Sequence, residues 1–565
     1  MNKNTIFKFL VAIVFLVQGV FANTLYINAK VFTGDKDKLY VDTFLVKDKK
    51  FKFIGKKNEA LKFTNKDTKI IDLQGKRVIP ALYDSHLHPI GAGTDLLFKC
   101  NFPQTSSIKE IQVKMRKCVS KAPKGSWITG VRWGAELLDK VHYKYLDEVS
   151  KDHYLVLTDF SNHNAWVNSK VIEVSNIDEE AIIKYGELIG KDQNGKPNGL
   201  LKEDAQKLYR SIKPSHTSVE MDKALVAAKN ILHSNGIIGI KDSYAYEPEI
   251  NTYLRAEKNN SLNLRVGVVF GWKKEGESLE AKKQRLLKMK SLETPYIKTN
   301  FIKLSIDGIP PTKTAALIEP YLEKDHSHGN NFGILEFNQE ELNKVVQWAD
   351  ENGFSVMTHS SGDMAVRQVL NAIEYTRDTN KNSKLQHELA HACMVHTNDI
   401  KRFRELNAVA NFSPFFWFPS PIHDGMKMLF GEKRANAYCA TKTLIDEKTK
   451  PTYGTDWPVV EAVNPFTALE SFVTRKDPYG RRGNETVWKE EAVSIEKALE
   501  MYTINGAIAL GIENESGTIS KGKTADFIVL NQDIFTINPD SIGDTKVELT
   551  VFDGKTIYKK QGNKK

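Results

Sequence analysis

Two histidines separated by one residue end a short apolar segment near residue 80. The segment runs from Arg77 to Pro89 and reads Arg-Val-Ile-Pro-Ala-Leu-Tyr-Asp-Ser-His-Leu-His-Pro, so the histidines are His86 and His88. On a β-strand, residues i and i+2 point to the same face, so both imidazoles can reach one cation. Histidine is the commonest metal ligand in proteins, and its imidazole suits zinc and related ions. A bare His-x-His motif has many false positives, so by itself it gives only a candidate metal site.

Three further side chains of metal-binding type occupy similar places. His359 ends the apolar run 354–358, His391 precedes a predicted helix, and Asp456 follows Thr-Tyr-Gly-Thr at residues 452–455. A single histidine in such a place is more often a hydrogen-bonded structural residue than a ligand. Four histidines and an aspartate that share this placement instead favour a metal centre.

Lys303 lies inside the apolar run Phe-Ile-Lys-Leu-Ser-Ile at residues 301–306. Lysine is almost never fully buried without a partner. One interpretation is a lysine that forms a salt bridge or extends its amine to solvent. The other is a buried amine of lowered pKa, which can react with carbon dioxide to form a carbamate. A carbamate is an anionic bidentate group that can bridge two metal ions, and the sequence alone leaves both interpretations open.

Short apolar strands alternate with amphipathic helices in the middle of the chain. Strands are predicted at 237–240, 301–306 and 354–359, and helices near 217–235, 339–352 and 363–377. This alternation predicts an α/β fold with a parallel sheet, open or closed. In parallel barrels the carboxyl ends of the strands carry the active site, which is where the candidate ligands fall. Residues 100–235 contain fewer clear strands and are predicted to form an insertion.

Short β-strands are predicted at both ends of the sequence. Short runs with period-two alternation and Gly, Asp or Asn turns occupy residues 24–71 and recur at 526–530 and 547–554. Chain termini often lie close together, so the two ends could form one small domain.

The first 22 residues have the organisation of a secretory signal peptide. Lys3 and Lys8 precede an apolar core at 10–17, and Val-Phe-Ala at 20–22 resembles a cleavage site. The core is shorter than the ~20 residues of a membrane span, although an uncleaved anchor is the alternative. We therefore expect an exported protein, periplasmic or secreted, with no membrane span after cleavage.

Export would permit disulfides, and the sequence has four cysteines. Cys100 and Cys118 flank a helical stretch, whereas Cys393 and Cys439 are widely separated. Four cysteines allow three pairings, and the sequence does not choose among them. No CxxC or Cys/His spacing of the zinc-finger type is present, which excludes a structural zinc finger.

The composition excludes several classes of protein. With 41% hydrophobic and 27% charged residues, the chain is neither disordered nor fibrous. Its 80 Lys and Arg exceed its 70 Asp and Glu, for a net charge of +10, and without the signal segment 78 against 70 leave +8. The basic residues are spread along the chain, so we expect no nucleic-acid partner.

Taken in order, the motifs resemble those of the amidohydrolase superfamily. Within it, they are similar to amidohydrolase family 3, which includes N-substituted formamide deformylase-like metal-dependent hydrolases. The similarity extends from about Thr24 to Tyr558. Its landmarks are the segments 79–88, 164–169, 195–203, 303–308, 314–317, 359–363, 391–392, 454–459 and 517–526. Each landmark alone is weak support, and all of them in order are strong support.

The resemblance implies a (β/α)8 TIM barrel over residues 79–511, with an inserted α/β segment at about 100–235. It also implies a small β-sandwich domain built from both chain ends, residues 23–78 and 512–560, after a signal peptide at 1–22. Each implied ligand would then lie at the carboxyl end of a barrel strand.

The resemblance also assigns roles at the metal centre. The implied ligands are His86, His88, Lys303, His359, His391 and Asp456. The first two histidines would hold one ion with Asp456, the last two histidines would hold a second, and carboxylated Lys303 would bridge them. One or two divalent ions are implied, with zinc as the expected metal. Asp456 would also take a proton from the attacking water and pass it to the leaving nitrogen.

The substrate contacts implied by the resemblance are Trp133, His163, Asp307 and Arg434. For His163 and Asp307 two other roles are equal alternatives, a contact behind a metal ligand and a purely structural role, because buried polar groups are often simply hydrogen-bonded. Residues 415–418, Phe-Phe-Trp-Phe, would line an apolar pocket or lie in the core. The sequence departs from the family pattern at Ala81 and Ala390, but it retains every implied ligand.

These observations predict an exported metal-dependent amidohydrolase that cleaves a non-peptide, amide-type carbon–nitrogen bond in a small molecule. Two alternatives are a deaminase or esterase on the same metal site, and a catalytically inactive periplasmic binding protein with the same fold. A homodimer is the default oligomer. The loops of a barrel set its substrate specificity, and their sequences here do not identify the substrate.

Overall fold

The computed structural model describes residues 23–160, 162–274, 276–322, 330–460 and 463–561. The predicted signal peptide, residues 1–22, lies outside the described residues. Within the described ranges, no helix has the length and apolar character that crossing a membrane requires.

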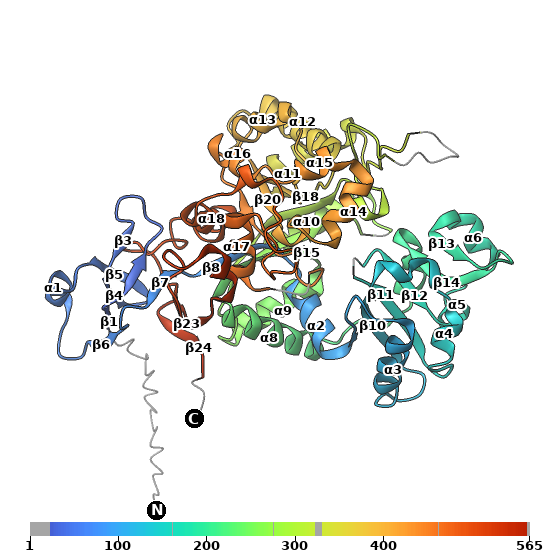
Figure 1. The fold of residues 1–565 in the computed structure, drawn as a ribbon, viewed down its shortest axis with the longest axis horizontal. Coiled ribbons are helices and arrows are strands. Elements are labelled where there is room, and N and C mark those ends of the chain that lie inside the picture. The colour runs from blue at the N-terminus through green and yellow to red at the C-terminus, as the bar shows by residue number, and fades with distance from the viewer. Residues whose placement is uncertain (1–22, 161, 275, 323–329, 461–462, 562–565) are drawn as a thin grey trace, which may run out of the picture.

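Eight parallel strands form the central sheet, and helices alternate with them along the chain (Figure 1). In spatial order the strands are β8 (Leu82–Leu87), β15 (Ile237–Ala245), β16 (Arg265–Gly271), β17 (Ile297–Ser305), β18 (Ser355–His359), β19 (His387–Ala390), β20 (Ala408–Phe412) and β21 (Thr452–Tyr453). Neighbouring strands pair in parallel throughout this order. The predicted α/β class and (β/α)8 TIM barrel are therefore confirmed.

The barrel closes between its first and last strands through backbone hydrogen bonds at their carboxyl ends. The Asp456 amide donates to the His86 carbonyl at 2.7 Å, and the His88 amide donates to the Trp457 carbonyl at 2.8 Å. Because β21 has only two residues, the loop that follows it makes this seam. Three of the implied metal ligands therefore lie on one seam.

Two helices that flank the insertion pack closely against each other on the barrel. α2 (Pro89–Phe98) and α8 (Ser218–Ser234) approach so closely that a Cβ on Gly93 would lie 2.0 Å from the Ala224 carbonyl oxygen. Only glycine permits this backbone approach. α8 falls inside the segment predicted as the insertion, yet Leu225 and its apolar neighbours belong to the barrel core. The sequence pattern shows that this helix is amphipathic but not which core it joins.

The insertion has a six-stranded sheet of its own. In spatial order its strands are β13 (Ile189–Lys191), β14 (Pro197–Lys202), β12 (Asn164–Val167), β11 (Tyr154–Asp159), β10 (Trp127–Trp133) and β9 (Cys100–Asn101). Trp133 and Trp166 are fully buried in one cluster with Ile111 of α3 (Ile108–Val119). A disulfide joins Cys100 to Cys118, and so links β9 to α3.

Strands from both chain ends form two further sheets beside the barrel, at the left of Figure 1. The four-stranded sheet has the order β5 (Lys50–Gly55), β4 (Thr43–Lys47), β1 (Thr24–Ile27) and β6 (Lys69–Asp72). The six-stranded sheet has the order β24 (Lys555–Lys559), β23 (Val547–Phe552), β22 (Phe527–Leu530), β7 (Arg77–Pro80), β2 (Lys30–Phe32) and β3 (Tyr40–Val41). Tyr26, Phe44 and Phe527 share one buried cluster, which joins the two ends of the sequence. The β-sandwich domain and its boundaries stay predictions.

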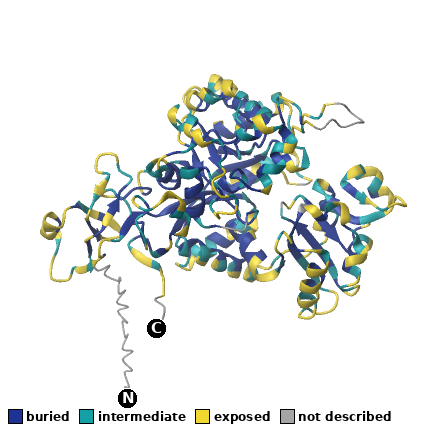
Figure 2. Cartoon of the chain, in the orientation of Figure 1, coloured by how far each residue is buried: buried dark blue, intermediate teal, exposed yellow. Residues whose placement is uncertain are grey.

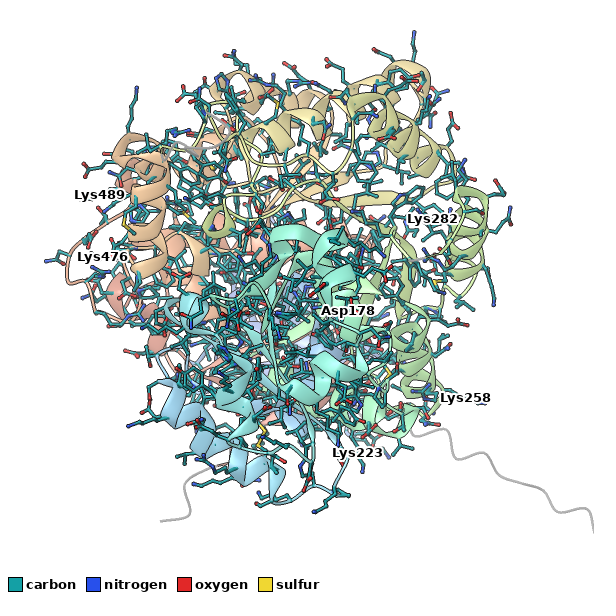
Figure 3. All side chains as sticks on the ribbon, turned by 90° about the vertical axis from the view of Figure 1, so that its right-hand side faces the viewer. Asp178, Lys223, Lys258, Lys282, Lys476 and Lys489 are labelled. Atoms are coloured by element: carbon teal, nitrogen blue, oxygen red, sulfur yellow. A yellow bond between two sulfur atoms is a disulfide. The ribbon has the colours of Figure 1, made fainter. Side chains whose placement is uncertain are left out.

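Burial follows this architecture. Figure 2 shows buried residues concentrated in the strands of the barrel and of the insertion, and exposed residues on the outer faces of the helices. Lys258 and Lys282, on α9 (Glu247–Lys258) and α10 (Leu279–Lys290), lie at the outer margin of the molecule in Figure 3.

Candidate metal centre

His86 and His88 lie at the carboxyl end of β8, where the strand turns into α2. Pro89 occupies the first position of α2 and His88 precedes it as the N-cap, so the helix begins directly after the second histidine. Each histidine places its Nε2 atom 3.4 Å from Asp456 Oδ1. The ligand atoms of these three residues all lie within 4.8 Å of one another. They form a compact donor set at the barrel rim.

Asp456 is held by the loop that closes the barrel. A Cβ on Gly454 would lie 2.4 Å from the His86 Cβ, so only glycine lets this loop pass so close to β8. Asp84, two residues before His86, accepts hydrogen bonds from the Thr455 amide at 3.1 Å and from the Thr455 hydroxyl at 2.6 Å. Burial raises the pKa of Asp84 to about 7, although both hydrogen bonds oppose the shift. Asp84 therefore links β8 to the loop that follows β21 by hydrogen bonds.

His391 and His359 complete the histidine cluster. His391 directly follows β19, with its ring centroid 4.7 Å from that of His86 and 4.8 Å from that of His359. The His391 Nε2 atom lies 4.0 Å from Asp456 Oδ2. His391 and Asp456 both have positive φ, +63° and +62°, a region that non-glycine residues rarely adopt. Such backbone strain typically marks functional sites.

Asp307 orients His359. Its Oδ1 atom accepts a hydrogen bond from His359 Nδ1 at 3.2 Å and another from the Ser361 amide at 3.0 Å. Its Oδ2 atom accepts from the Gly362 amide at 2.8 Å. A carboxylate that binds one imidazole nitrogen fixes the tautomer and leaves the other nitrogen available to a metal. The structure therefore places Asp307 behind an implied ligand, which is one of the roles that the sequence left open for it.

Lys303 is buried within the same cluster. Its Nζ atom lies 3.4 Å from His86 Nε2, near the carboxyl end of β17. Burial lowers the pKa of Lys303 to about 8. A buried amine in this place is close enough to the implied ligands to reach a shared ion.

The protonation states of the cluster suit a metal ion. Burial lowers the pKa of His391 to about 3 and holds the pKa of His86 well below its usual value, so both imidazoles are neutral at pH 7. Burial alone would raise the pKa of Asp456, but the hydrogen bond with His88 and the positive charges around it hold that pKa below its usual value. Metal ions bind neutral imidazole and ionised carboxylate. The donor set therefore fits a divalent metal ion.

The other three predicted substrate contacts have different neighbours. Trp133 is buried in the core of the insertion, where its indole N–H donates to the Leu157 carbonyl at 3.0 Å. His163 pairs through Nδ1 with Glu203 at 2.8 Å. Arg434 donates to three backbone carbonyl groups, those of Phe430, Glu319 and Pro320.

Sequence reasoning missed Asp84 and Thr455. Asp84 has the same strand parity as His86, so the pattern Asp-x-His-x-His contained a signal that it faces the site. The partner hydroxyl of Thr455 is 371 residues away and leaves no local signal. Of the aromatic run 415–418, Phe416 lies with its ring centroid 6.1 Å from that of His391, whereas Trp417 is fully buried.

Comparison with known proteins agrees with this geometry. The model of the amidohydrolase family matches residues 69–558. YtcJ of Bacillus subtilis (strain 168), whose name assigns it to the amidohydrolases, is 28% identical over 506 residues, which cover 88% of this chain and 92% of YtcJ. The N-substituted formamide deformylase of Arthrobacter pascens is 24% identical over 560 residues, which cover 95% of this chain and 98% of that enzyme.

A solved structure shares the fold. An uncharacterized metal-dependent hydrolase from Pyrococcus horikoshii OT3 superposes with a TM-score of 0.74 at 22% identity, covering 92% of this chain and 99% of that one. Because the family model spans most of the sequence, including every residue of the cluster, the chain belongs to the amidohydrolase family.

Proposed function

We propose that the protein is an exported amidohydrolase that cleaves a non-peptide carbon–nitrogen bond, of the amide type, in a small molecule. One observation carries the proposal: His86, His88 and Asp456 converge within 4.8 Å at the barrel seam, with His359, His391 and Lys303 around them. These six side chains come from the ends of five different strands, and no structural requirement of the barrel explains why they meet at one place. A metal-dependent hydrolytic site explains why they do.

Asp456 is the residue that moves the proton in this proposal. It is buried, ionised and held by the seam loop within 3.4 Å of two imidazole nitrogens. A fixed carboxylate can accept a proton from water and later donate it to a leaving nitrogen. When bound, a divalent metal ion supplies Lewis acidity, which polarises a carbonyl group and acidifies water. Phe416, beside His391, would shield one side of the reacting group from solvent.

The amide-type bond is supported by a relative over nearly the whole chain. The Arthrobacter pascens protein is an N-substituted formamide deformylase, and the match covers 98% of it. A deaminase or an esterase would use the same donor set, so substrate turnover has to separate them. A panel of N-formyl amines, N-acylamino acids, ureas, aminopurines and esters does so, with formate, free amine, ammonia and acid as products.

The decisive comparison is between the native protein and Asp456→Asn on this panel. We expect turnover of at least one amide-type substrate and a fall of about 10²–10⁴-fold in kcat in the variant. Turnover only of aminopurines or only of esters would replace the proposal with the corresponding alternative. Tight binding of a substrate with no turnover by either protein would instead indicate a binding protein.

We also propose that the site holds one or two zinc ions and that carboxylated Lys303 bridges two of them. Lys303 Nζ lies in the cluster, 3.4 Å from His86 Nε2. Elemental analysis of native protein and Lys303→Gln should show loss of about one metal ion per chain in the variant. Lys303→Glu, which restores a carboxylate, should recover part of the metal. Equal metal content in all three proteins would contradict a bridging role.

Export rests on the sequence of residues 1–22 and on the cysteine pairs. Cys100–Cys118 and Cys393–Cys439 are both disulfides, and such bonds persist mainly in oxidising compartments. Expression with residues 1–22 present should give protein in the periplasm or medium that lacks this segment. Amino-terminal sequencing of the mature chain checks the cleavage point after Ala22.

A further inference from the structure

A cavity outside the metal centre lies where the insertion meets the barrel helices. It has a volume of about 250 Å³, and the side chains that matter for its chemistry are Lys99, Thr129, Thr158, Arg210, Lys213 and His216. They come from the end of α2, from β10 and β11, from α7 (Lys207–Arg210) and from the segment before α8. Figure 1 shows α2 between the barrel and the strands of the insertion. None of these residues belongs to the metal cluster.

Three basic side chains line the cavity, and among the described residues only one of them, Lys99, has an ion-pair partner. Lys99 pairs with Asp95 at 2.5 Å. Arg210 instead donates to the neutral oxygens of Gln206, at 2.7 Å, and Tyr209, at 3.4 Å. In the part of the chain that the structure describes, no carboxylate forms an ion pair with Lys213. Two cations therefore face the cavity without a counter-ion.

The pKa of Lys213 reflects the crowding of positive charge around the cavity. Burial lowers the pKa of Lys213, and the positive charges of Lys99 and Arg210 lower it further, whereas Asp95 opposes the shift. An anion in the cavity would oppose this shift, because an opposite charge close to an ammonium group favours its charged form.

The floor of the cavity carries a hydroxyl with no partner. Thr158 on β11 is 7% exposed, and its Oγ1 atom is buried without a hydrogen-bond partner among the described residues. Buried polar groups nearly always have a partner, and each exception needs an explanation. A hydroxyl can donate to an anionic oxygen, as can the ammonium and guanidinium groups beside it.

We propose that this cavity binds a small anion, a phosphate or carboxylate group, through Arg210, Lys213 and the Thr158 hydroxyl. Its volume suits an inorganic oxyanion or the acidic end of a small molecule. The site is separate from the metal centre. α2 has ten residues between His88 and Lys99, which corresponds to about 15 Å along the helix axis. The proposal does not depend on which bond the enzyme cleaves.

Binding of inorganic phosphate and of succinate to the metal-loaded full chain tests the proposal. Calorimetry and thermal shift should detect binding of one or both to the native protein. Arg210→Gln and Lys213→Gln should each weaken it by about tenfold or more, because each removes a charge-assisted hydrogen bond. Lys258→Gln makes the same change of charge on the outer margin of α9, as Figure 3 shows, and should leave binding unchanged. Phosphate binding without succinate binding would assign the site to phosphate, and the reverse would assign it to carboxylates.

Thr158→Val separates binding from stability. Removal of an unpartnered buried hydroxyl should keep or raise the melting temperature of the ligand-free protein, while phosphate or succinate binds more weakly. Phosphate can also bind the metal centre, so every titration is repeated on Asp456→Asn. Binding that Asp456→Asn abolishes and Lys213→Gln retains would overturn the proposal. So would native protein that binds neither anion, or equal affinities in native, Arg210→Gln and Thr158→Val proteins.

Discussion

Asp84 controls the metal centre without being one of its implied ligands. Its carboxylate accepts hydrogen bonds from the His86 amide at 3.2 Å, from the Thr455 amide at 3.1 Å and from the Thr455 hydroxyl at 2.6 Å. One of these donors belongs to the ligand His86, and Thr455 directly precedes the ligand Asp456 on the other side of the seam. The position of both ligands therefore depends on one buried carboxylate.

Asp84→Asn should lower metal affinity by about 10–100-fold, as is usual when a group that orients a ligand is replaced. The asparagine oxygen can still accept from the two backbone amides, but its NH2 group then faces the Thr455 hydroxyl and cannot accept the hydrogen bond that this hydroxyl donates. Thr455→Val removes the hydroxyl that donates to Asp84 and accepts from the Trp457 amide, but it keeps the Thr455 backbone amide. It should have a smaller effect of the same sign. Competition with a fluorescent zinc chelator measures the affinities, and kcat should fall more than KM changes.

Asp477→Asn is the matched control for Asp84→Asn. Asp477 is also buried and accepts hydrogen bonds from the backbone amides of Tyr479 and Arg481. Neither of these partners belongs to the metal cluster. It should lower thermal stability without changing metal affinity. If the two variants lose the same stability and neither loses metal affinity, Asp84 is only a structural residue.

The candidate ligands could be predicted from the sequence because each follows a strand signal. His86 and His88 depend only on strand parity, and His359 on the end of an apolar run. The contacts of Asp307 could not be predicted, since its partners Ser361 and Gly362 belong to the next strand's loop. Sequence gives the residue types that can bind a metal, but hydrogen bonds between loops arise only in the folded barrel.

At the scale of elements, the disulfide Cys393–Cys439 anchors the loop that carries His391. Cys393 lies two residues after this histidine, and the Cys439 amide also donates to the Cys393 carbonyl at 2.7 Å. The bond joins residues 46 apart. It therefore links the loop after β19 to the segment that follows α15 (Glu432–Asn436).

Replacing both cysteines, Cys393→Ser with Cys439→Ser, should destabilise the protein by about 3–4 kcal/mol, because the unfolded chain regains the freedom of a long loop. Metal content should fall as well, since His391 loses its anchor. The control is Cys100→Ser with Cys118→Ser in the insertion, which should lower the melting temperature but leave metal content unchanged. Equal metal loss in both double variants would show that the effect is not local to His391.

A helix packed against the barrel gives a pH-dependent prediction. Glu470 on α17 (Pro465–Thr474) is buried and accepts a hydrogen bond from the Gly543 amide at 2.7 Å. Burial raises the pKa of Glu470 to about 7, and the charges of Asp540 and Asp544 contribute to the rise. The folded state thus holds a proton that the unfolded chain releases near the usual value of 4.5.

Between these two pKa values the folded protein binds more protons, so its stability falls as the pH rises from about 4.5 to 7. Glu470→Gln keeps an acceptor for Gly543 and removes this loss. We expect the variant to be more stable than the native protein by about 1–2 kcal/mol at pH 8, with little difference at pH 4.5. Melting temperatures at both pH values measure it, with exposed Glu490→Gln as the control that changes neither. If the variant were less stable than the native protein at pH 8, ionisation of Glu470 would not destabilise the fold.

At the scale of the whole molecule, the alternation of strands and helices predicts a parallel sheet but not every strand. β21 has two residues, too few for any periodic signal, and only the Gly-Thr-Asp motif after it marks the eighth strand. β9 of the insertion is equally short. The insertion's sheet pairs some strands in parallel and others antiparallel, so it lacks the regular alternation of the barrel.

One buried ion cluster connects the barrel to the C-terminal strands. Arg265 begins β16, and its guanidinium donates to Asp526 at 2.8 Å and to Asp553 at 2.7 Å. All three side chains are buried, with exposed fractions of 5%, 3% and 8%. Asp526 precedes β22 and Asp553 follows β23. Because these strands pair antiparallel, both aspartates lie at the same end of the pair, and the cluster holds that end against the barrel.

Arg265→Leu should destabilise the protein by about 3–5 kcal/mol, because it leaves two buried carboxylates without their counter-ion. In the native protein Arg265 holds the pKa of Asp526 below its usual value against the effect of burial. The contribution of this ion pair to the stability of the fold is therefore present above about pH 4 and is lost only on further acidification. In the variant the carboxylates would take up protons more readily. The gap between native and variant stability should therefore widen from pH 4 to pH 7.

The exposed pair of Arg255 with Asp222 provides the comparison that assigns this effect to burial. Their side chains are 36% and 46% exposed at a distance of 2.7 Å, and Arg255→Leu should cost at most about 1 kcal/mol at any pH. Thermal unfolding at pH 5 and pH 7 measures both variants. A pH-independent loss in Arg265→Leu would mean that the guanidinium acts by packing against Phe552 and Tyr296, not by its charge. A loss that grows with pH would show that a buried charge cluster keeps the C-terminal strands on the barrel.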